Sequence, residues 1–168
     1  VAKIHYEPMG IYAGKTTSLE NLPDGATIAV PNDATNEARA LQLLAAQGLI
    51  EVDPEAGMNA TLNDITSNPK NLEITELDAA MIANTLEEFD LNVINSNYAM
   101  LGGLDPATDA LVSEAADSEA AQTYANIVAV KSGHENDPAI VALVEALQSD
   151  AVRDYINNTY NGAVAPAF

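Results

Sequence analysis

The sequence predicts an α/β fold. Short apolar runs typical of strands alternate with longer segments in which apolar residues recur at helical spacing. Side chains that cap helix N-termini stand at several of the boundaries between them, and glycine or proline follows the expected ends. With 168 residues, 48% of them hydrophobic, the chain can bury a core for one domain or two small lobes.

The first expected elements lie in the N-terminal third. Residues 4–12 look extended, and a short helix is expected at 19–22. A buried strand follows at 26–30 and ends at a proline. The next helix has capping oxygens at positions 32–35, which accept hydrogen bonds from unpaired backbone N–H groups, and a glycine at position 48 is expected to end it.

Two further strands are expected at 72–77 and 91–94, the first because apolar and polar residues alternate. Asp78 can cap a helix between them that runs through Met81 and Leu86. The sequence contains no internal repeat, and no flexible linker separates these segments.

The C-terminal third is expected to contain a buried strand at 124–130 and two helices. Pro138 after Asp137 marks the first helix, since proline is well suited to the first helical position. Ser149 or Asp150 opens the second. The inner stripe of the first helix is expected to consist of Ile140, Val141, Val144 and Leu147.

The composition narrows the possible functions. The chain has 25 acidic and 6 basic residues, a net charge of −19, so nucleic acid and anionic lipid are poor partners. Without cysteine, disulfides and thiol catalysis are excluded. No apolar run is long enough to span a bilayer. Because the opening residues already look like a strand, we expect the true N-terminus to lie upstream.

Known catalytic signatures are missing from the sequence. It contains no phosphate-binding glycine loop, no zinc-binding HExxH and no nucleophile elbow. His134 lies in a polar turn, where an exposed loop histidine is the simpler interpretation. We therefore expect no enzyme activity and no cofactor or metal.

Arg39 is the most informative single residue. It lies early in the helix expected between the capping residues 32–35 and Gly48, where unpaired N–H groups and the helix dipole favour an anion. Its planar guanidinium suits a carboxylate such as that of an amino acid. The alternative is a surface arginine paired with Glu37 or another acid.

Polar amides stand near two apolar strands. Asn95, with Asn97 beyond it, follows the strand at 91–94, and Asn126 lies inside the run at 124–130. A buried amide needs partners and can serve both an ammonium and a carboxylate group. The alternatives are a turn residue for Asn95 and a satisfied core amide for Asn126.

Three side chains with aromatic rings lie in the first extended segment. His5, Tyr6 and Tyr12 could form an apolar wall suited to a thioether side chain through sulfur–aromatic contact. Ordinary core packing is the alternative.

Read together, these segments resemble the methionine-binding lipoproteins of ABC importers, the NlpA/MetQ-like family. The resemblance covers about residues 5–168 and rests on PNDATNEARAL, the downstream VINSNYA, and the closing GAVAPAF. It implies a two-lobed periplasmic-binding-protein-like (type II) α/β fold, with the ligand in the cleft between lobes and delivery to an ABC permease complex. The protein would be extracytoplasmic and membrane-anchored through an N-terminal lipid.

The resemblance also implies roles for particular residues. Arg39 would clamp the carboxylate of L-methionine or a related amino acid. Asn95 and Asn126 would fix its amino and carboxylate groups. The side-chain pocket would involve His5 with Tyr6 or Tyr12. Asn36 is a weaker candidate beside Arg39.

The chain resembles only the last two thirds of such a protein, so the first lobe is expected to be incomplete. Residues 1–24 and 96–168 are expected to form part of lobe one, and residues 25–95 lobe two. Other ligands remain open, namely another apolar amino acid or a methionine-containing dipeptide, as does a small α/β enzyme or regulatory domain.

Overall fold

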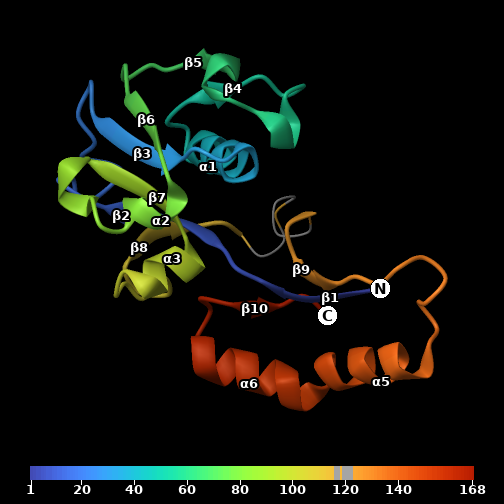
Figure 1. Cartoon of the computed structure of the whole chain (residues 1–168). Helices are drawn as coiled ribbons and strands as arrows, with labels where there is room; N and C mark the ends of the chain where they lie inside the picture. Colours follow the sequence, from blue (N-terminus) through green and yellow to red (C-terminus); the bar gives the residue numbers. More distant parts are fainter. Residues whose placement is uncertain (116–117, 119–122) are drawn as a thin grey trace. The chain divides into compact units, whose positions relative to one another are not determined.

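The computed structural model describes residues 1–115, 118 and 123–168. The chain forms two compact units (Figure 1). Unit 1 comprises Val1–Pro8 and Ala115–Phe168, and unit 2 comprises Met9–Glu114. Unit 2 is larger than the lobe expected at 25–95, because strands on both sides of that range pair into its sheet.

Unit 2 is built on a five-stranded sheet in the order β6-β3-β7-β2-β8. The strands are β2 (Met9–Ala13), β3 (Thr27–Pro31), β6 (Glu73–Leu77), β7 (Leu91–Asn95) and β8 (Ala110–Ser113). Strand β3 runs parallel to β6 and β7, whereas β2 is antiparallel to β7 and β8. A separate two-stranded ladder joins β4 (Glu51–Val52) and β5 (Ile65–Ser67).

The helices of unit 2 follow the parallel strands. They are α1 (Ala34–Ala46), α2 (Ala79–Ile82) and α3 (Ser96–Leu101), with 3₁₀ turns η1 (Gly57–Asn59), η2 (Leu62–Asp64) and η3 (Leu86–Glu88). Asp78 caps α2 as predicted, but the helix stops at Ile82 instead of running through Leu86. The helix expected at 19–22 is wrong, since this segment forms a turn.

Each face of this sheet packs against its own apolar group, because successive strand residues point to opposite faces. One face includes Met9, Ile11, Ile28, Val30, Leu91 and Val93, packed with Leu41 and Leu44 of α1. The other includes Tyr12, Ala29 and Ile94, packed with Ile82 of α2 and Ala99 of α3. Helix α1 is therefore fixed on one face of the sheet, and α2 and α3 on the other.

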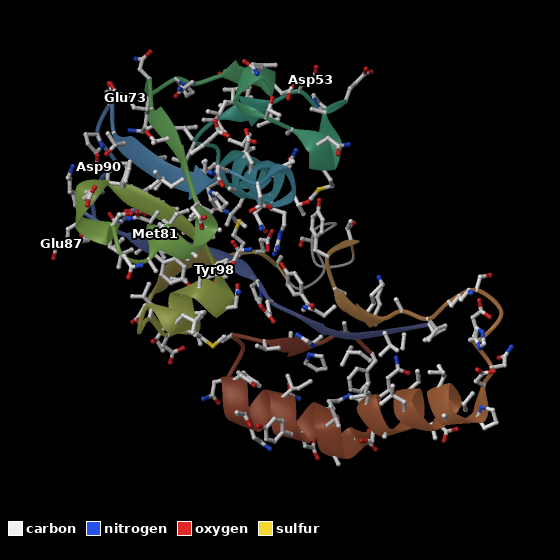
Figure 2. The ribbon with its side chains drawn as sticks, viewed as in Figure 1. Asp53, Glu73, Met81, Glu87, Asp90 and Tyr98 are labelled. Carbon is white, nitrogen blue, oxygen red and sulfur yellow. The ribbon has the colours of Figure 1, made fainter. Side chains whose placement is uncertain are left out.

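Asp90 links the start of β7 to two other segments (Figure 2). Its carboxylate accepts hydrogen bonds from the backbone N–H of Thr27 at 2.9 Å and from both threonine hydroxyls, Thr16 and Thr27, at 3.0 Å. The backbone bond from Thr27 is the main reason that the pKa of Asp90 lies below its usual value.

We expect Asp90→Asn to destabilise unit 2 by about 2 kcal/mol at neutral pH, the scale of hydrogen bonds to a charged group. A carboxyl whose folded pKa is lowered stabilises the fold above its unfolded pKa, and this stability is lost as pH falls through the folded pKa. Urea unfolding of both proteins from pH 7 downward should therefore show the difference shrinking in acid. A difference that stayed constant with pH would contradict an ionised Asp90.

Unit 1 contains, in its described part, a three-stranded antiparallel sheet in the order β10-β1-β9 (Figure 1). Its elements are β1 (Ala2–Tyr6), β9 (Asn126–Val128), α5 (Pro138–Leu147), α6 (Asp150–Tyr160) and β10 (Ala165–Pro166). Ser149 caps α6 through its side chain.

Of two burial predictions in unit 1, one is confirmed in part and one is wrong. Three residues of the stripe expected on the inner side of α5 are half-buried, namely Ile140, Val144 and Leu147, whereas Val141 is 40% exposed. The run at 124–130 forms only the short strand β9, in which Ile127 is 63% exposed.

Candidate functional site

The candidate site lies in unit 2, at the carboxyl ends of β3 and β7. These strands are parallel, and a helix begins directly after each: α1 after β3 and α3 after β7. Ligands of open α/β sheets bind outside this edge, where loops and helix N-termini converge. Asp33 caps α1, and its side chain accepts a hydrogen bond from the Asn36 backbone N–H.

Arg39 is held inside unit 2 by a carboxylate. It is only 6% exposed, so it is not a surface residue, but it is paired with an acid other than Glu37, as the alternative interpretation held. Its Nε donates to Glu114 Oε1 at 3.1 Å and its Nη2 to Glu114 Oε2 at 2.5 Å. Nη1 is directed toward Asn36 Oδ1, 3.5 Å away. The Glu37 carboxylate instead accepts from the Leu62 backbone N–H at 3.0 Å.

Glu37 is buried in the first turn of α1. This burial is the main reason that its pKa is raised above the usual value, and the neighbouring Glu76 and Asp64 carboxylates raise it further, while the bond from Leu62 lowers it. Glu37 therefore connects α1 to η2 and is a structural group next to the site.

A chain of side-chain hydrogen bonds fixes the amide orientations at this edge. Asp33 can only accept when ionised, so Asn36 turns its Nδ2 toward it, at 3.0 and 2.9 Å. The Asn36 Oδ1 then accepts from Asn95 Nδ2 at 2.8 Å. The Asn95 Oδ1 is left buried, and it accepts no hydrogen bond from any side chain or backbone group that the structure describes.

This arrangement brings Asn36, Arg39 and Asn95, three of the predicted site residues, close together. Asn95 precedes α3 but forms no side-chain capping bond, so a capping role does not explain it. A guanidinium near the start of α1 suits a carboxylate, and an unmatched amide oxygen suits an N–H donor. The three side chains together fit the two charged ends of an amino acid.

Tyr12 lies on the opposite face of the sheet from α1, in the apolar group with Ile82 and Ile94. It is 1% exposed, and its hydroxyl has no partner among the described residues. Burial, followed by the nearby Asp109 and Asp105 carboxylates, raises its pKa to about 12. This position matches the alternative of core packing.

The remaining candidates, His5, Tyr6 and Asn126, belong to unit 1. His5 and Asn126 are cross-strand neighbours in the pairing of β1 with β9. The His5 Nε2 lies 3.1 Å from Glu7 Oε1, and Tyr6 is buried at 3% exposure. Asn126 is exposed, which contradicts its expected place in a buried strand.

The part of the chain that the structure describes contains neither a cluster of metal ligands nor a membrane-spanning helix. In residues 1–115, 118 and 123–168 no group of three or more His, Cys, Asp or Glu side chains could hold a metal ion. Over the same residues, no helix has the length and apolar character needed to cross a bilayer.

A family model described as NlpA lipoprotein matches residues 1–168. The chain belongs to the NlpA lipoprotein family. This agrees with the family resemblance of the PNDATNEARAL and VINSNYA segments, which supply Asn36, Arg39 and Asn95.

Relatives in the NlpA family share both sequence and fold with this chain. The methionine-binding lipoprotein MetQ of Bacillus subtilis is 42% identical over 97% of this chain and 60% of that protein. The structure of a nutrient binding protein from Burkholderia cenocepacia bound to methionine has a TM-score of 0.88 and 42% identity, covering 99% of this chain and 69% of that one. A periplasmic substrate-binding protein of an ABC transporter from Coxiella burnetii has a TM-score of 0.87 and 46% identity, covering 99% and 68%.

These likenesses confirm the predicted α/β substrate-binding fold. The chain spans 55–61% of the length of three curated relatives that it matches, in line with the expectation of an incomplete first lobe.

Sequence reasoning missed Glu114 and Asp33 as parts of the site. Asp33 was expected only as a helix cap, although its position three residues before Asn36 is the signal for both roles. Glu114 follows the short apolar run of β8, which was not predicted as a strand. No local signal distinguishes Glu114 from the other acidic residues of the chain.

Proposed function

We propose that this chain forms the ligand-binding part of an extracytoplasmic lipoprotein that captures methionine for an ABC importer. The observation that carries the proposal is the group of Asn36, Arg39 and Asn95 at the carboxyl ends of β3 and β7. The names of the relatives, and a relative's structure bound to methionine, support this choice of ligand.

In the proposed complex, different residues bind the carboxylate and the ammonium group of the ligand. The carboxylate is bound by Arg39 near the N-terminus of α1, through a charge-assisted hydrogen bond. The ammonium group donates to the Asn95 Oδ1, which the hydrogen-bond chain from Asp33 and Asn36 presents as an acceptor. The site binds and releases its ligand without chemical change, so the protein is not an enzyme.

Rings and an amide are predicted to make further contacts with the ligand. His5, Tyr6 and Asn126 of unit 1 stay predicted contributors, whereas Tyr12 is buried in the core of unit 2. Sulfur–aromatic contacts would favour a thioether over an equally long aliphatic chain. Delivery to a membrane permease and anchoring by an N-terminal lipid follow from the same proposal, since relatives are named as lipoproteins and as an ABC transporter component.

Native mass spectrometry of the full-length protein, followed by calorimetry, tests this function. We expect co-purified methionine, and after its removal tight binding of methionine with weaker binding of leucine. Both enantiomers and glycyl-methionine should be titrated, because relatives are named for methionine and for D-methionine. Equal affinity for leucine would indicate a general apolar amino acid site. No affinity for any of these ligands would reject the proposal.

A further inference from the structure

Asp33 determines which end of a neighbouring amide faces it. Its side chain caps α1 by accepting a hydrogen bond from the Asn36 backbone N–H at 3.1 Å. The two carboxylate oxygens also accept from the Asn36 Nδ2, at 3.0 and 2.9 Å. An ionised carboxylate has no proton to donate, so Asn36 must turn its NH₂ group toward Asp33 and its Oδ1 away from it.

The orientation of Asn36 determines that of Asn95. The Asn36 Oδ1 accepts a hydrogen bond from the Asn95 Nδ2 at 2.8 Å, and the Arg39 Nη1 lies 3.5 Å from the same oxygen. Because this bond occupies the Asn95 Nδ2, the other end of that amide is its Oδ1. This oxygen is buried and has no hydrogen-bond partner among the described residues. The hydrogen-bond chain of Asp33, Asn36 and Asn95 therefore ends in an acceptor, which suits a ligand with a donor at this place.

An asparagine at position 33 would reverse the chain. Its Oδ1 can keep the bond from the Asn36 backbone N–H, since asparagine caps helices about as well as aspartate does. Its NH₂ group then replaces the oxygen that lies 2.9 Å from the Asn36 Nδ2. Two donors cannot bond each other, so Asn36 would rotate its amide, and Asn95 would rotate in turn and leave its Nδ2 unmatched. Apart from exchanged partners, the reversal loses only the long contact from Arg39 to Asn36.

We propose that Asp33 is a positioning and specificity-determining residue, which acts through Asn36 to make Asn95 an acceptor. The site thereby selects a ligand with an N–H donor beside its carboxylate. The ammonium group of an amino acid supplies this donor, whereas the corresponding 2-oxo acid has a carbonyl oxygen at the same carbon and can only accept. This inference deepens the proposed function and rests on it for the identity of the ligand.

The test compares L-methionine with 4-(methylthio)-2-oxobutanoate, the 2-oxo acid with the same side chain. Calorimetry on the full-length protein at constant ionic strength gives both affinities for the wild type, Asp33→Asn, Asp33→Ser and Asp78→Asn. Serine removes the same charge from the same place, but its hydroxyl can still accept from Asn36. Asp78 caps α2 by accepting from the Ala80 backbone N–H at 2.9 Å, so its variant repeats the substitution at a cap outside the hydrogen-bond chain. Circular dichroism confirms that each variant is folded.

We expect the wild type to prefer methionine, and Asp33→Asn to lower the ratio of methionine to 2-oxo acid affinity by at least about tenfold, the scale of one hydrogen bond to a charged group. Asp33→Ser should lower it by less than about threefold, because Asp33 is exposed and salt screens its charge. Asp78→Asn should keep the wild-type ratio. An unchanged ratio in Asp33→Asn, or an equal fall in Asp33→Ser, overturns the inference, although methionine binding by the wild type would stand.

A second measurement needs no ligand. Neutron diffraction locates deuterons on amide nitrogens, which X-ray diffraction at ordinary resolution does not. In the wild type the Asn95 deuterons should lie on the side of Asn36, and in Asp33→Asn the Asn36 deuterons should lie on the side of Asn95. The reverse order in the wild type, or the same order in both proteins, contradicts the positioning role. If the wild type binds no methionine but the deuterons lie as expected, the proposed function fails and the positioning role of Asp33 stands.

Discussion

Arg39→Ala is expected to lower the affinity for L-methionine by about a hundredfold or more, because it removes a charge-assisted bond in a buried setting. Arg153→Ala is expected to change the affinity less than about twofold, within the usual range of surface substitutions. Arg153 pairs with Asp150 and lies over the Phe168 ring, 5.0 Å from its centroid, so its contacts are local. Calorimetry of both variants decides the prediction.

Stability must be separated from affinity in this comparison. Arg39→Ala also leaves Glu114 buried without its main partner, which destabilises a fold by roughly 3–5 kcal/mol. Affinities are therefore measured well below the unfolding temperature of the variant. Arg39→Lys keeps the charge but not the planar fork, so it should bind with intermediate affinity. Equal losses for the Arg39 and Arg153 variants would remove Arg39 from the site.

The parts of the fold that were predictable from sequence depend on local signals. Helix α1 begins after the Asp33 cap and ends before Gly48, whose φ of +70° suits a residue without a side chain. Likewise β3, β6 and β7 appear within one or two residues of their predicted limits. Capping oxygens and apolar alternation act within a few residues, so the sequence alone displays them.

Long-range pairing explains most of the differences between the structure predicted from the sequence and the structure observed. The bond between Arg39 and Glu114 joins residues 75 positions apart, and no local pattern indicates which acid of 25 is the partner. The unit boundary likewise depends on β2 and β8 pairing beside β7, which local patterning could not show. In unit 1, the apolar stripe of α5 was recognised correctly as apolar, but burial depends on which elements cover it.

In the candidate site, too, the features with local signals could be predicted, whereas those that depend on long-range packing could not. Arg39, Asn36 and Asn95 were identified through their types, their places beside expected elements and a family resemblance, and the structure brings them together. Tyr12 was grouped with His5 because both lie in one extended segment. A strand places alternate side chains on opposite faces, and a break at Pro8 separates β1 from β2, so closeness in sequence does not imply a shared surface.

Gly14→Ala is expected to destabilise unit 2 by about 3 kcal/mol or more, at the upper end of over-packing effects. A Cβ at Gly14 would overlap the carbonyl oxygens of Leu86 and Phe89 and lie 2.9 Å from Asn92 Nδ2. These carbonyls are backbone atoms that cannot rotate away. Glycine is required here by close approach, since the φ of Gly14 lies outside the left-handed region. Urea unfolding of the variant measures the loss.

Gly25→Ala is the matched control, because no atom of the described residues other than Gly25 and its chain neighbours lies within 4 Å of a Cβ at that position, and its φ of +74° opposes a side chain. It should cost about 1 kcal/mol, the lower range of backbone strain at a single residue. The two variants therefore separate steric overlap from backbone strain. Because Gly14 adjoins the segment that leads into β7, a displaced β7 would also move Asn95 at its far end. A Gly14 variant as stable as the Gly25 variant would show that the 86–92 segment can move aside, and Asn95 would then be less rigidly placed than the proposed ammonium contact requires.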